Sequence, residues 1–364
     1  SMHVRSKVKI ASHVLFCDLQ KDFNQEAPLL ILLRSPQDVD GMKIVCKETN
    51  GIFTPVRLEG KLLGLDMNIQ KSTHIHDGSF FGVIGIDCLK AKQLLPKAIQ
   101  YIVDSLQLGS GYTLKGHFFV PENDDQEFSF QGDIQGNKCL FLGYTVDAII
   151  VKASISPTKC LLEDVKLEDQ AGHLSVKYLR IDKDPFSNQW HLEMPLGHLR
   201  ECKPSLLLTS GKRGAEKAFV LKNLSVYELR GTLGDMKSFV GKGALHFYNA
   251  NKKEFSLLDI PIELFKDLGL DTGILTPISG EVDFTIKKGR CMFIDLKNSY
   301  SEGRRSEFYL SGDTLAYVDF EGNWHVDLKM KQHVLLKWSE SLIVSIRGTL
   351  NKPKYSLKNI NDSL

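Results

Sequence analysis

The residue types that most often do chemistry are sparse in this chain, and the first grouping of them is His74-Ile-His76-Asp77. If this run lies on a strand, both imidazoles project from one side, where they could bind a metal ion. The neighbouring sequence offers no third or fourth ligand. We therefore interpret the run as an exposed loop or strand end, and we predict no metal site and no cofactor.

Cysteine thiols are the second group that could act chemically, as metal ligands or redox centres. The chain has seven, an odd number, and none is closer than 21 positions to the next. No CxxC pair exists, which argues against a structural zinc site or a thioredoxin-like centre. We interpret them as small hydrophobic residues buried in strands, although an oxidising compartment would permit a disulfide whose partners the sequence does not identify. The seven are Cys17, Cys46, Cys88, Cys139, Cys160, Cys202 and Cys291.

Two polar loops have the composition, but not the spacing, of known ion and phosphate sites. The turn PENDDQE, Pro121 to Glu127, lacks the spaced ligands of a calcium loop. The loop Ser210 to Gly214 contains GKRG but lacks the GxxxxGK[ST] spacing and the following helix of a phosphate-binding loop. Acidic residues otherwise fall mainly at alternating polar positions, which is typical of a solvated strand face. Nothing selects a catalytic group, so we predict that the protein is not an enzyme.

Composition excludes two further classes of function. The net charge is +2 and the pI is near 8.0, with basic residues interleaved among acidic ones. No basic stripe with stacking aromatic residues is present, so we predict no nucleic-acid partner. No run reaches ~18 apolar residues, so the sequence predicts no transmembrane helix. Ser1-Met2 is typical of a cloning remnant, and we expect the natural N-terminal segment to be missing.

The elements that must position these residues are strands, and the clearest of them is Pro277 to Lys287. Apolar and polar residues alternate there with a period of two, as one dry and one wet strand face require. A glycine stands among the apolar residues, and the same arrangement recurs in six other segments. Glycine within a strand either permits strong coiling of the sheet or leaves room beside it for another group, and the sequence does not separate these roles. The other segments are 58–62, 114–118, 130–134, 229–233, 310–314 and 346–350.

Two amphipathic helices interrupt this strand pattern, at Ala91–Leu106 and Asp259–Leu268. Asp87 is suited to cap the first, and Pro96 must kink it or mark its first turn. Either helix could bind a membrane surface or a partner, but we expect such helices to cover the apolar face of the sheet. Each ends in Leu-Gly and leads into a glycine-containing strand, which indicates a weak internal repeat of about 160 residues.

The order of segments from Leu229 to Leu357 resembles the C-terminal region of the AsmA-like family of bacterial envelope proteins (the AsmA/TamB/YhdP type). The residues that carry the resemblance are VGKGALHFYNA, the helix IELFKDLGL, ISGEVDFTIKKGRCMFIDL, LSGDTLAYVDFEGNWHVDLKM and SIRGTLNKPKYSL. The resemblance divides the chain into residues 1–225, a repeated β-sheet region with one helix, and residues 226–364, the AsmA-like region continuous with it.

The resemblance implies a mostly β fold, an elongated antiparallel sheet folded into a U (a β-taco) whose apolar interior holds lipid acyl chains. It implies a periplasmic protein, anchored in the inner membrane through a missing N-terminal segment, that supports phospholipid transport between the two membranes. The alternative is an assembly factor that binds outer-membrane proteins by strand pairing. The residues expected to line the lipid groove are Leu58, Gly60, Leu114, Gly116, Phe118, Leu229, Gly231, Leu233, Ile278, Gly280, Val282, Phe284, Ile286, Leu310, Gly312, Ile346, Gly348 and Leu350.

Overall fold

The fold is mostly β, and strands make up 79% of the residues described in a computed structural model of the chain. Within the part that is described, the strands divide into two compact units. Unit 1 comprises residues 1–169 and 180–188, and unit 2 comprises residues 170–179 and 189–364. The described residues are 2–10, 13–21, 28–36, 41–49, 51–72, 79–95, 100, 103–104, 107–119, 127–141, 144–203, 219–249, 277–312, 315–334, 337–349 and 352–359.

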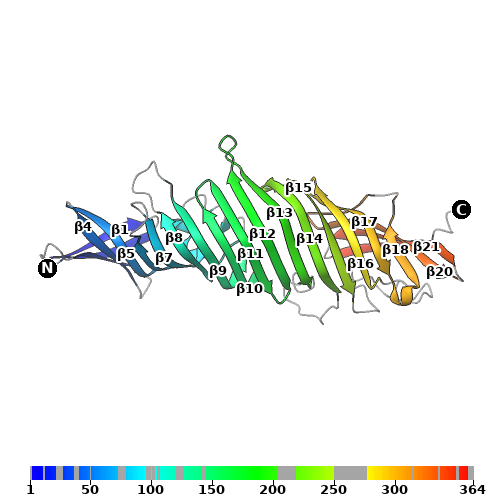
Figure 1. The fold of residues 1–364 in the computed structure, drawn as a ribbon, viewed down its shortest axis with the longest axis horizontal. Helices are drawn as coiled ribbons and strands as arrows, with labels where there is room; N and C mark the ends of the chain where they lie inside the picture. The colour runs from blue at the N-terminus through cyan, green and yellow to red at the C-terminus, as the bar shows by residue number, and fades with distance from the viewer. Residues whose placement is uncertain are drawn as a thin grey trace. The chain divides into compact units, whose positions relative to one another are not determined.

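Unit 1 is an antiparallel sheet in which each strand from β1 to β11 pairs with the next along the chain (Figure 1). Short hairpins such as the one at Gly51 make this sequential pairing possible, because glycine adopts the positive φ of 78° that the turn needs. Its strands are β1 (Met2–Ile10), β2 (His13–Lys21), β3 (Leu29–Arg34), β4 (Gly41–Thr49), β5 (Ile52–Leu62), β6 (Leu65–Lys71), β7 (Ser79–Ile86), β8 (Tyr112–Phe119), β9 (Ser129–Phe141), β10 (Tyr144–Ile155) and β11 (Lys159–Asp169).

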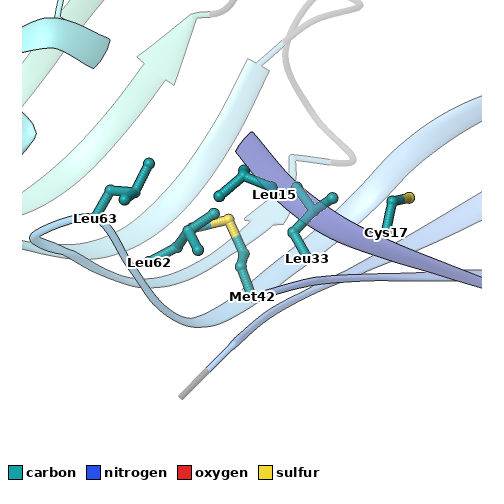
Figure 2. Close-up of a cluster of buried hydrophobic side chains, with 6 residues drawn as sticks. All are labelled: Leu15, Cys17, Leu33, Met42, Leu62 and Leu63. Atoms are coloured by element: carbon teal, nitrogen blue, oxygen red, sulfur yellow. The ribbon is translucent and has the colours of Figure 1, made fainter. Parts of the chain in front are cut away.

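The core of unit 1 lies on one face of this sheet. Figure 2 shows one of its clusters, formed by six side chains from β2, β3, β4 and the β5–β6 hairpin. A second cluster continues across β6 to β10, where the rings of Phe118 and Phe130 lie 4.9 Å apart. The residues in Figure 2 are Leu15, Cys17, Leu33, Met42, Leu62 and Leu63.

Unit 2 continues the same sequential pairing from β13 to β17 and from β20 to β22. Between these two runs, β18 and β19 both pair with β17 on one side and with β20 on the other, so they act as two halves of one interrupted strand. The strands are β13 (Trp190–Cys202), β14 (Phe219–Thr232), β15 (Asp235–Asn249), β16 (Ser279–Lys287), β17 (Arg290–Tyr300), β18 (Ser306–Leu310), β19 (Ala316–Asp319), β20 (Asn323–Val334), β21 (Lys337–Thr349) and β22 (Lys352–Asn359). Strand β12 (Gly172–Lys183) has residues in both units.

The predicted orientation of β16 is confirmed for residues 281–284, whereas Ile278, predicted to face the apolar interior, lines a polar hollow. Phe284 is 4% exposed, and Val282 packs against a buried cluster of unit 2. On the other face Glu281 is exposed, and Asp283 forms an ion pair with Lys297 of β17. The period-two alternation therefore does mark one dry and one wet face of this strand.

The prediction of one continuous helix over Ala91–Leu106 is wrong. The described residues there form α1 (Cys88–Ala91) and the 3-10 turn η1 (Lys92–Leu94), and Gln100, Val103 and Asp104 are helical again. Asp87 caps α1 as predicted, accepting a hydrogen bond from the Lys90 N–H at 3.3 Å. Leu95 is extended, with ψ of 149°, because a residue before proline is disfavoured in the helical region. The second predicted helix, residues 259–268, lies outside the described residues.

The short helical segment nevertheless covers the sheet, as expected of it. Leu94 packs against the cluster shown in Figure 2, and Cys88 belongs to a third cluster of unit 1 with Tyr112 and Cys139. The predicted U-shaped cross-section and the predicted boundary at residue 225, which lies in β14, stay predictions.

Candidate apolar binding site

Unit 2 contains an apolar cavity with a volume of about 130 Å³. Its lining comes from strands β14 to β18, β20 and β21 and from Pro277, which precedes β16. Twelve of the fourteen lining residues are aliphatic or phenylalanine side chains or proline, and the other two are a serine and a tryptophan. The lining residues are Leu221, Leu245, Phe247, Pro277, Val282, Phe293, Leu296, Ser299, Phe308, Leu310, Trp324, Val326, Leu328 and Ile346.

Strands that do not pair with one another share this cavity. Four pairing steps separate β15 from β20, which would place them roughly 19 Å apart in a flat sheet. Yet Phe247 of β15 belongs to one buried cluster with Phe308 of β18, Met330 of β20 and Leu342 of β21. The cavity and this cluster therefore draw on residues from several successive strands of unit 2.

The size of the cavity limits what it can hold. An apolar cavity of about 150 Å³ can stay dry and accept a benzene-sized molecule, whereas pockets for drug-sized ligands usually measure about 300–1,000 Å³. At about 130 Å³, this cavity fits a slender hydrocarbon segment rather than a whole lipid. None of the fourteen lining residues carries a titratable side chain, so the site offers no acid, base or cation.

A bulge in β17 explains how the lining is assembled. Asp283 is level with Asp295 and the next residue, Phe284, is level with Phe293, so Ile294 is the extra residue. Ile294 is 61% exposed, and Phe293 and Leu296 both line the cavity although they are three positions apart. Strict alternation would put them on opposite faces, and the bulge restores them to one face.

Three of the residues predicted to line a lipid groove meet at this cavity: Val282, Leu310 and Ile346. Leu58, Leu114 and Phe118 lie in the apolar clusters of unit 1 instead. The other predicted residues that the structure describes do not line it; they are Gly60, Gly116, Leu229, Gly231, Leu233, Ile278, Gly280, Phe284, Ile286, Gly312 and Gly348.

Gly312 is exposed in a turn after β18 rather than within a strand, with no atom within 4 Å of where its Cβ would be, so it is not a notch. A glycine spaced two residues from an apolar strand residue is equally compatible with a turn. Leu350 lies outside the described residues.

The glycine notches of unit 2 are filled by aromatic rings, which is a use that sequence reasoning missed. A Cβ on Gly280 would lie 2.7 Å from the Phe247 ring, and one on Gly231 would lie 2.7 Å from the Phe239 ring. Packing of an aromatic ring over a cross-strand glycine stabilises a sheet where the glycine itself offers no side chain. The predicted room for an acyl chain beside these two glycines is therefore occupied by the protein.

In unit 1 the glycines allow the backbones of neighbouring strands to approach closely. Gly82 pairs with Gly116, and Gly116 pairs with Gly132, so three glycines stand in one row across β7, β8 and β9. A Cβ on Gly116 would lie 2.7 Å from the Gly132 Cα, which is closer than real Cβ contacts come. Coiling of the sheet, rather than ligand access, explains these positions.

The cysteines are buried or half-buried thiols, none of them in a disulfide. Six lie in strands, and Cys88 lies in α1. Burial raises the pKa of Cys202 to about 11, and burial together with the Asp182 carboxylate raises the pKa of Cys160 to about 12. Such thiols stay protonated at neutral pH, so the prediction that they serve as small hydrophobic residues is confirmed.

A polar hollow of about 470 Å³ lies on the other face of the β15–β17 region. His246 and Glu281, which are level with each other, contribute to it, as do Asn298 and Tyr300 of β17. The Arg304 guanidinium lies 5.0 Å from the centre of the Tyr300 ring. Gly280 lines the hollow, and a Cβ added to it would lie 2.7 Å from the Phe247 ring and 3.1 Å from the Ser299 Cβ, both residues of the apolar cavity.

Other sites that the sequence suggested are not described. His74 to Asp77, the turn from Pro121 to Gln126 and the loop Ser210 to Gly214 all lie outside the described residues. In the described part of the chain, no three His, Cys, Asp or Glu side chains come together as metal ligands would. Nor does this part contain a helix with the length and apolar character needed to cross a membrane.

Comparison with known proteins adds no relative. No protein-family model, curated protein or solved structure matches this chain.

Proposed function

We propose that this protein binds a lipid acyl chain without chemically changing it, as one segment of a conduit or carrier for lipids. The observation that carries the proposal is the cavity of unit 2, whose lining is almost entirely hydrocarbon and includes no titratable group. A cavity of this kind favours apolar ligands because transfer of apolar surface out of water is favourable, and it offers no means of acid–base catalysis.

The wider setting is part of the same proposal and rests on the resemblance to AsmA-like proteins. The chain would act in the periplasm, supporting phospholipid transport between the inner and outer membranes, with its sheet folded into a U around the acyl chains. The shared lining of one cavity by β14–β15 and β20–β21 is what supports the proposal of such a cross-section.

Val282→Arg tests the proposal. Val282 lines the cavity, and its neighbours on the adjacent strands are Leu245 and Leu296, so an arginine there would place a charge among hydrocarbon side chains. Ile294→Arg is the matched control, because it makes a similar change at a residue that is 61% exposed. Lipid that co-purifies with each protein is extracted and quantified by mass spectrometry, and folding is checked by thermal melting.

We expect lipid in the extracts of the unmodified protein and of Ile294→Arg, and little in that of Val282→Arg. Val282→Trp fills space without adding charge and should also lose lipid. It shows whether added volume alone, without a buried charge, excludes the lipid. If folded Val282→Arg and Val282→Trp proteins both retain their lipid, this cavity does not bind it.

A second function is favoured by the terminal strands. Among the described strands, β1 pairs with β2 alone and β22 pairs with β21 alone, so each has one edge free for strand addition. In β1, Val4 and Val8 are 41% and 37% exposed. These edges would suit an assembly factor that pairs with outer-membrane proteins. Lysines in both strands and Pro353 in β22 oppose unselective pairing, so we rank this function second.

A further inference from the structure

The first strand of unit 1, β1, has one paired edge and one free edge. Among the described strands it pairs with β2 alone, along all 9 of its residues. Its other edge is therefore a row of backbone donors and acceptors that a further strand could use. The side chains on the two faces of β1 indicate which strand would fit there.

The apolar face of β1 continues the core face of unit 1 but is only partly covered. Residues that are level in an antiparallel pair point to the same face, and Val8 is level with Leu15 of β2. Leu15 is fully buried in the cluster shown in Figure 2, whereas Met2, Val4 and Val8 are 49%, 41% and 37% exposed. A strand added at the free edge would cover these three residues with apolar side chains of its own.

The opposite face of β1 is basic along its whole length, and β1 contains no acidic residue. On the side toward β2, the Arg5 Nε lies 2.9 Å from the Asp18 carboxylate, and the Lys7 Nζ lies 5.8 Å from the centre of the Phe16 ring. The Arg5 side chain is nevertheless 88% exposed. The exposed residues that form this basic row are His3, Arg5, Lys7 and Lys9.

These charges determine the composition of a fitting strand. Cross-strand pairs of opposite charge stabilise two paired strands, and like charges directly opposite each other destabilise them. An added strand therefore needs acidic residues level with the basic row and apolar residues level with Val4 and Val8. Because side chains alternate between the faces of a strand, the fitting sequence alternates acidic and apolar residues.

A second copy of this chain does not meet this requirement. When two β1 strands pair antiparallel with their apolar rows on the same face, basic residues stand opposite basic residues in every register. Strand β22 meets the same obstacle, because it carries Lys352, Lys354 and Lys358 and no acidic residue. Pairing between copies is therefore opposed at both of these edges.

An anionic membrane surface fits less well than a strand. The basic and apolar rows of β1 lie on opposite faces, so a flat surface can contact one row but not both. A membrane also offers no regular row of hydrogen-bond partners to the backbone of the free edge. A strand beside β1 contacts both rows and pairs with the backbone.

We propose that β1 binds, by strand addition at its free edge, an extended segment of another protein in which acidic residues alternate with apolar ones. This interaction goes beyond lipid binding, since β1 belongs to unit 1 and the cavity to unit 2. It also specifies the partner for the strand-pairing function: the basic row selects an acidic strand.

The experiment measures the fluorescence anisotropy of labelled peptides of 9 residues, the length of β1, with the full chain. The peptide TEVETEVET has the proposed alternation, TKVKTKVKT has the opposite charge, and TTTEEEEVV has the acidic composition without the alternation. Lys7→Glu combined with Lys9→Glu reverses the charge of the edge and leaves the Arg5–Asp18 ion pair in place.

The matched control combines Lys47→Glu with Lys115→Glu. It makes the same change of charge at exposed residues of β4 and β8, which are paired along both edges. Folding of both double variants is checked by thermal melting.

The unmodified protein should bind TEVETEVET about tenfold more tightly than either of the other peptides, because only this peptide matches both rows of β1. Lys7→Glu with Lys9→Glu should weaken the affinity for TEVETEVET about tenfold and strengthen that for TKVKTKVKT. The control should behave as the unmodified protein does. N-methylation of alternate residues removes the donors from one edge of TEVETEVET, so one of the two alternate patterns should abolish binding.

Equal binding of TEVETEVET and TTTEEEEVV by the unmodified protein would overturn the proposal, and this comparison does not depend on the folding of any variant. So would an unchanged affinity of the folded Lys7→Glu, Lys9→Glu protein for TEVETEVET, or full binding of both N-methylated forms. Co-sedimentation with phosphatidylglycerol vesicles, or self-association of the chain, that is lost in this variant would assign the edge to a membrane or to a second copy instead. Each of these outcomes leaves acyl binding at the cavity intact.

Discussion

At the scale of single residues, burial decides what the polar and titratable side chains do. The thiols are the clearest case: desolvation raises the pKa of Cys160 and Cys291 to about 12, so they behave as apolar side chains rather than as nucleophiles. Ser299 is the opposite case, because its burial leaves a hydroxyl without a partner beside an apolar cavity. Residue type alone suggests neither outcome, since both depend on what surrounds the side chain.

The raised pKa of Cys160 predicts a loss of stability at alkaline pH. Below pH 9 its thiol is protonated in the folded and unfolded chain alike, since the ordinary value is 9.0. Between pH 9 and about 12 the unfolded chain loses a proton that the folded chain keeps, so the free energy of unfolding falls as pH rises. The contribution of this one thiol is at most about 1.4 kcal/mol per pH unit.

Cys160→Ala should therefore show a shallower decline above pH 9 than the unmodified protein, with urea unfolding as the measurement. The other six cysteines remain in the variant and act as the internal control. Identical slopes for the two proteins would mean that the Cys160 thiol ionises as readily in the folded chain as in the unfolded one.

At the scale of elements, the strands form as their alternation predicts, but bulges and glycines decide how they pack. The extra residue at Ile294 brings Phe293 and Leu296 to the same face, and the Phe247 ring covers Gly280. The short α1 shows a similar local control, because Pro96 favours an extended Leu95 at the end of η1. The alternation of apolar and polar residues thus predicts which segments form strands. The bulge at Ile294 and the ring over Gly280 determine which side chains line the cavity.

Gly280→Ala tests the ring-filled notch. The added Cβ would lie 2.7 Å from the Phe247 ring, so the ring must move, at a cost of about 1–3 kcal/mol in unfolding free energy. Gly312→Ala is the control: Gly312 has open space around it, and we expect a change within about 0.5 kcal/mol.

A double variant makes the test specific to this pair. Phe247→Leu removes the ring, so adding Gly280→Ala to it should cost less than adding Gly280→Ala to the unmodified protein. Chemical denaturation of the four proteins gives the coupling energy. Strict additivity would show that the ring does not fill the notch.

At the scale of the whole molecule, the chain consists of two units with separate apolar clusters. Each unit is built from strands that contact mainly their neighbours in sequence, an arrangement in which stability is close to a sum of local terms. The candidate cavity is lined by residues of unit 2 alone. A substitution in the core of unit 1 should therefore have little effect on ligand binding at the cavity.

Phe130→Ala tests this independence. Phe130 is 2% exposed in unit 1 and packs against Phe118, so its truncation should cost about 3–5 kcal/mol in the stability of that unit. Scanning calorimetry should show one transition moving to lower temperature while the other stays, with the affinity for an acyl ligand unchanged. Ile346→Ala, in the cavity lining, should do the reverse and weaken binding. A single transition that moves as a whole in both variants would show that the two units unfold as one.

The sequence by itself determined the strands, the wet and dry faces of β16, the Asp87 cap and the burial of the cysteines. These features depend on residues close together in the chain, where a period of two or a capping side chain is visible directly. It also pointed to three of the cavity-lining residues, Val282, Leu310 and Ile346.

Only the tertiary structure decided which apolar residues meet. Leu245 and Leu328 line one cavity although more than eighty residues separate them, and no local pattern encodes that meeting. The bulge at Ile294 changes which residues of β17 face inward, and the rings over Gly280 and Gly231 occupy space that the sequence pattern left open. The unpartnered hydroxyl of Ser299 is of the same kind, because the absence of a hydrogen-bond partner is a property of everything packed around a side chain.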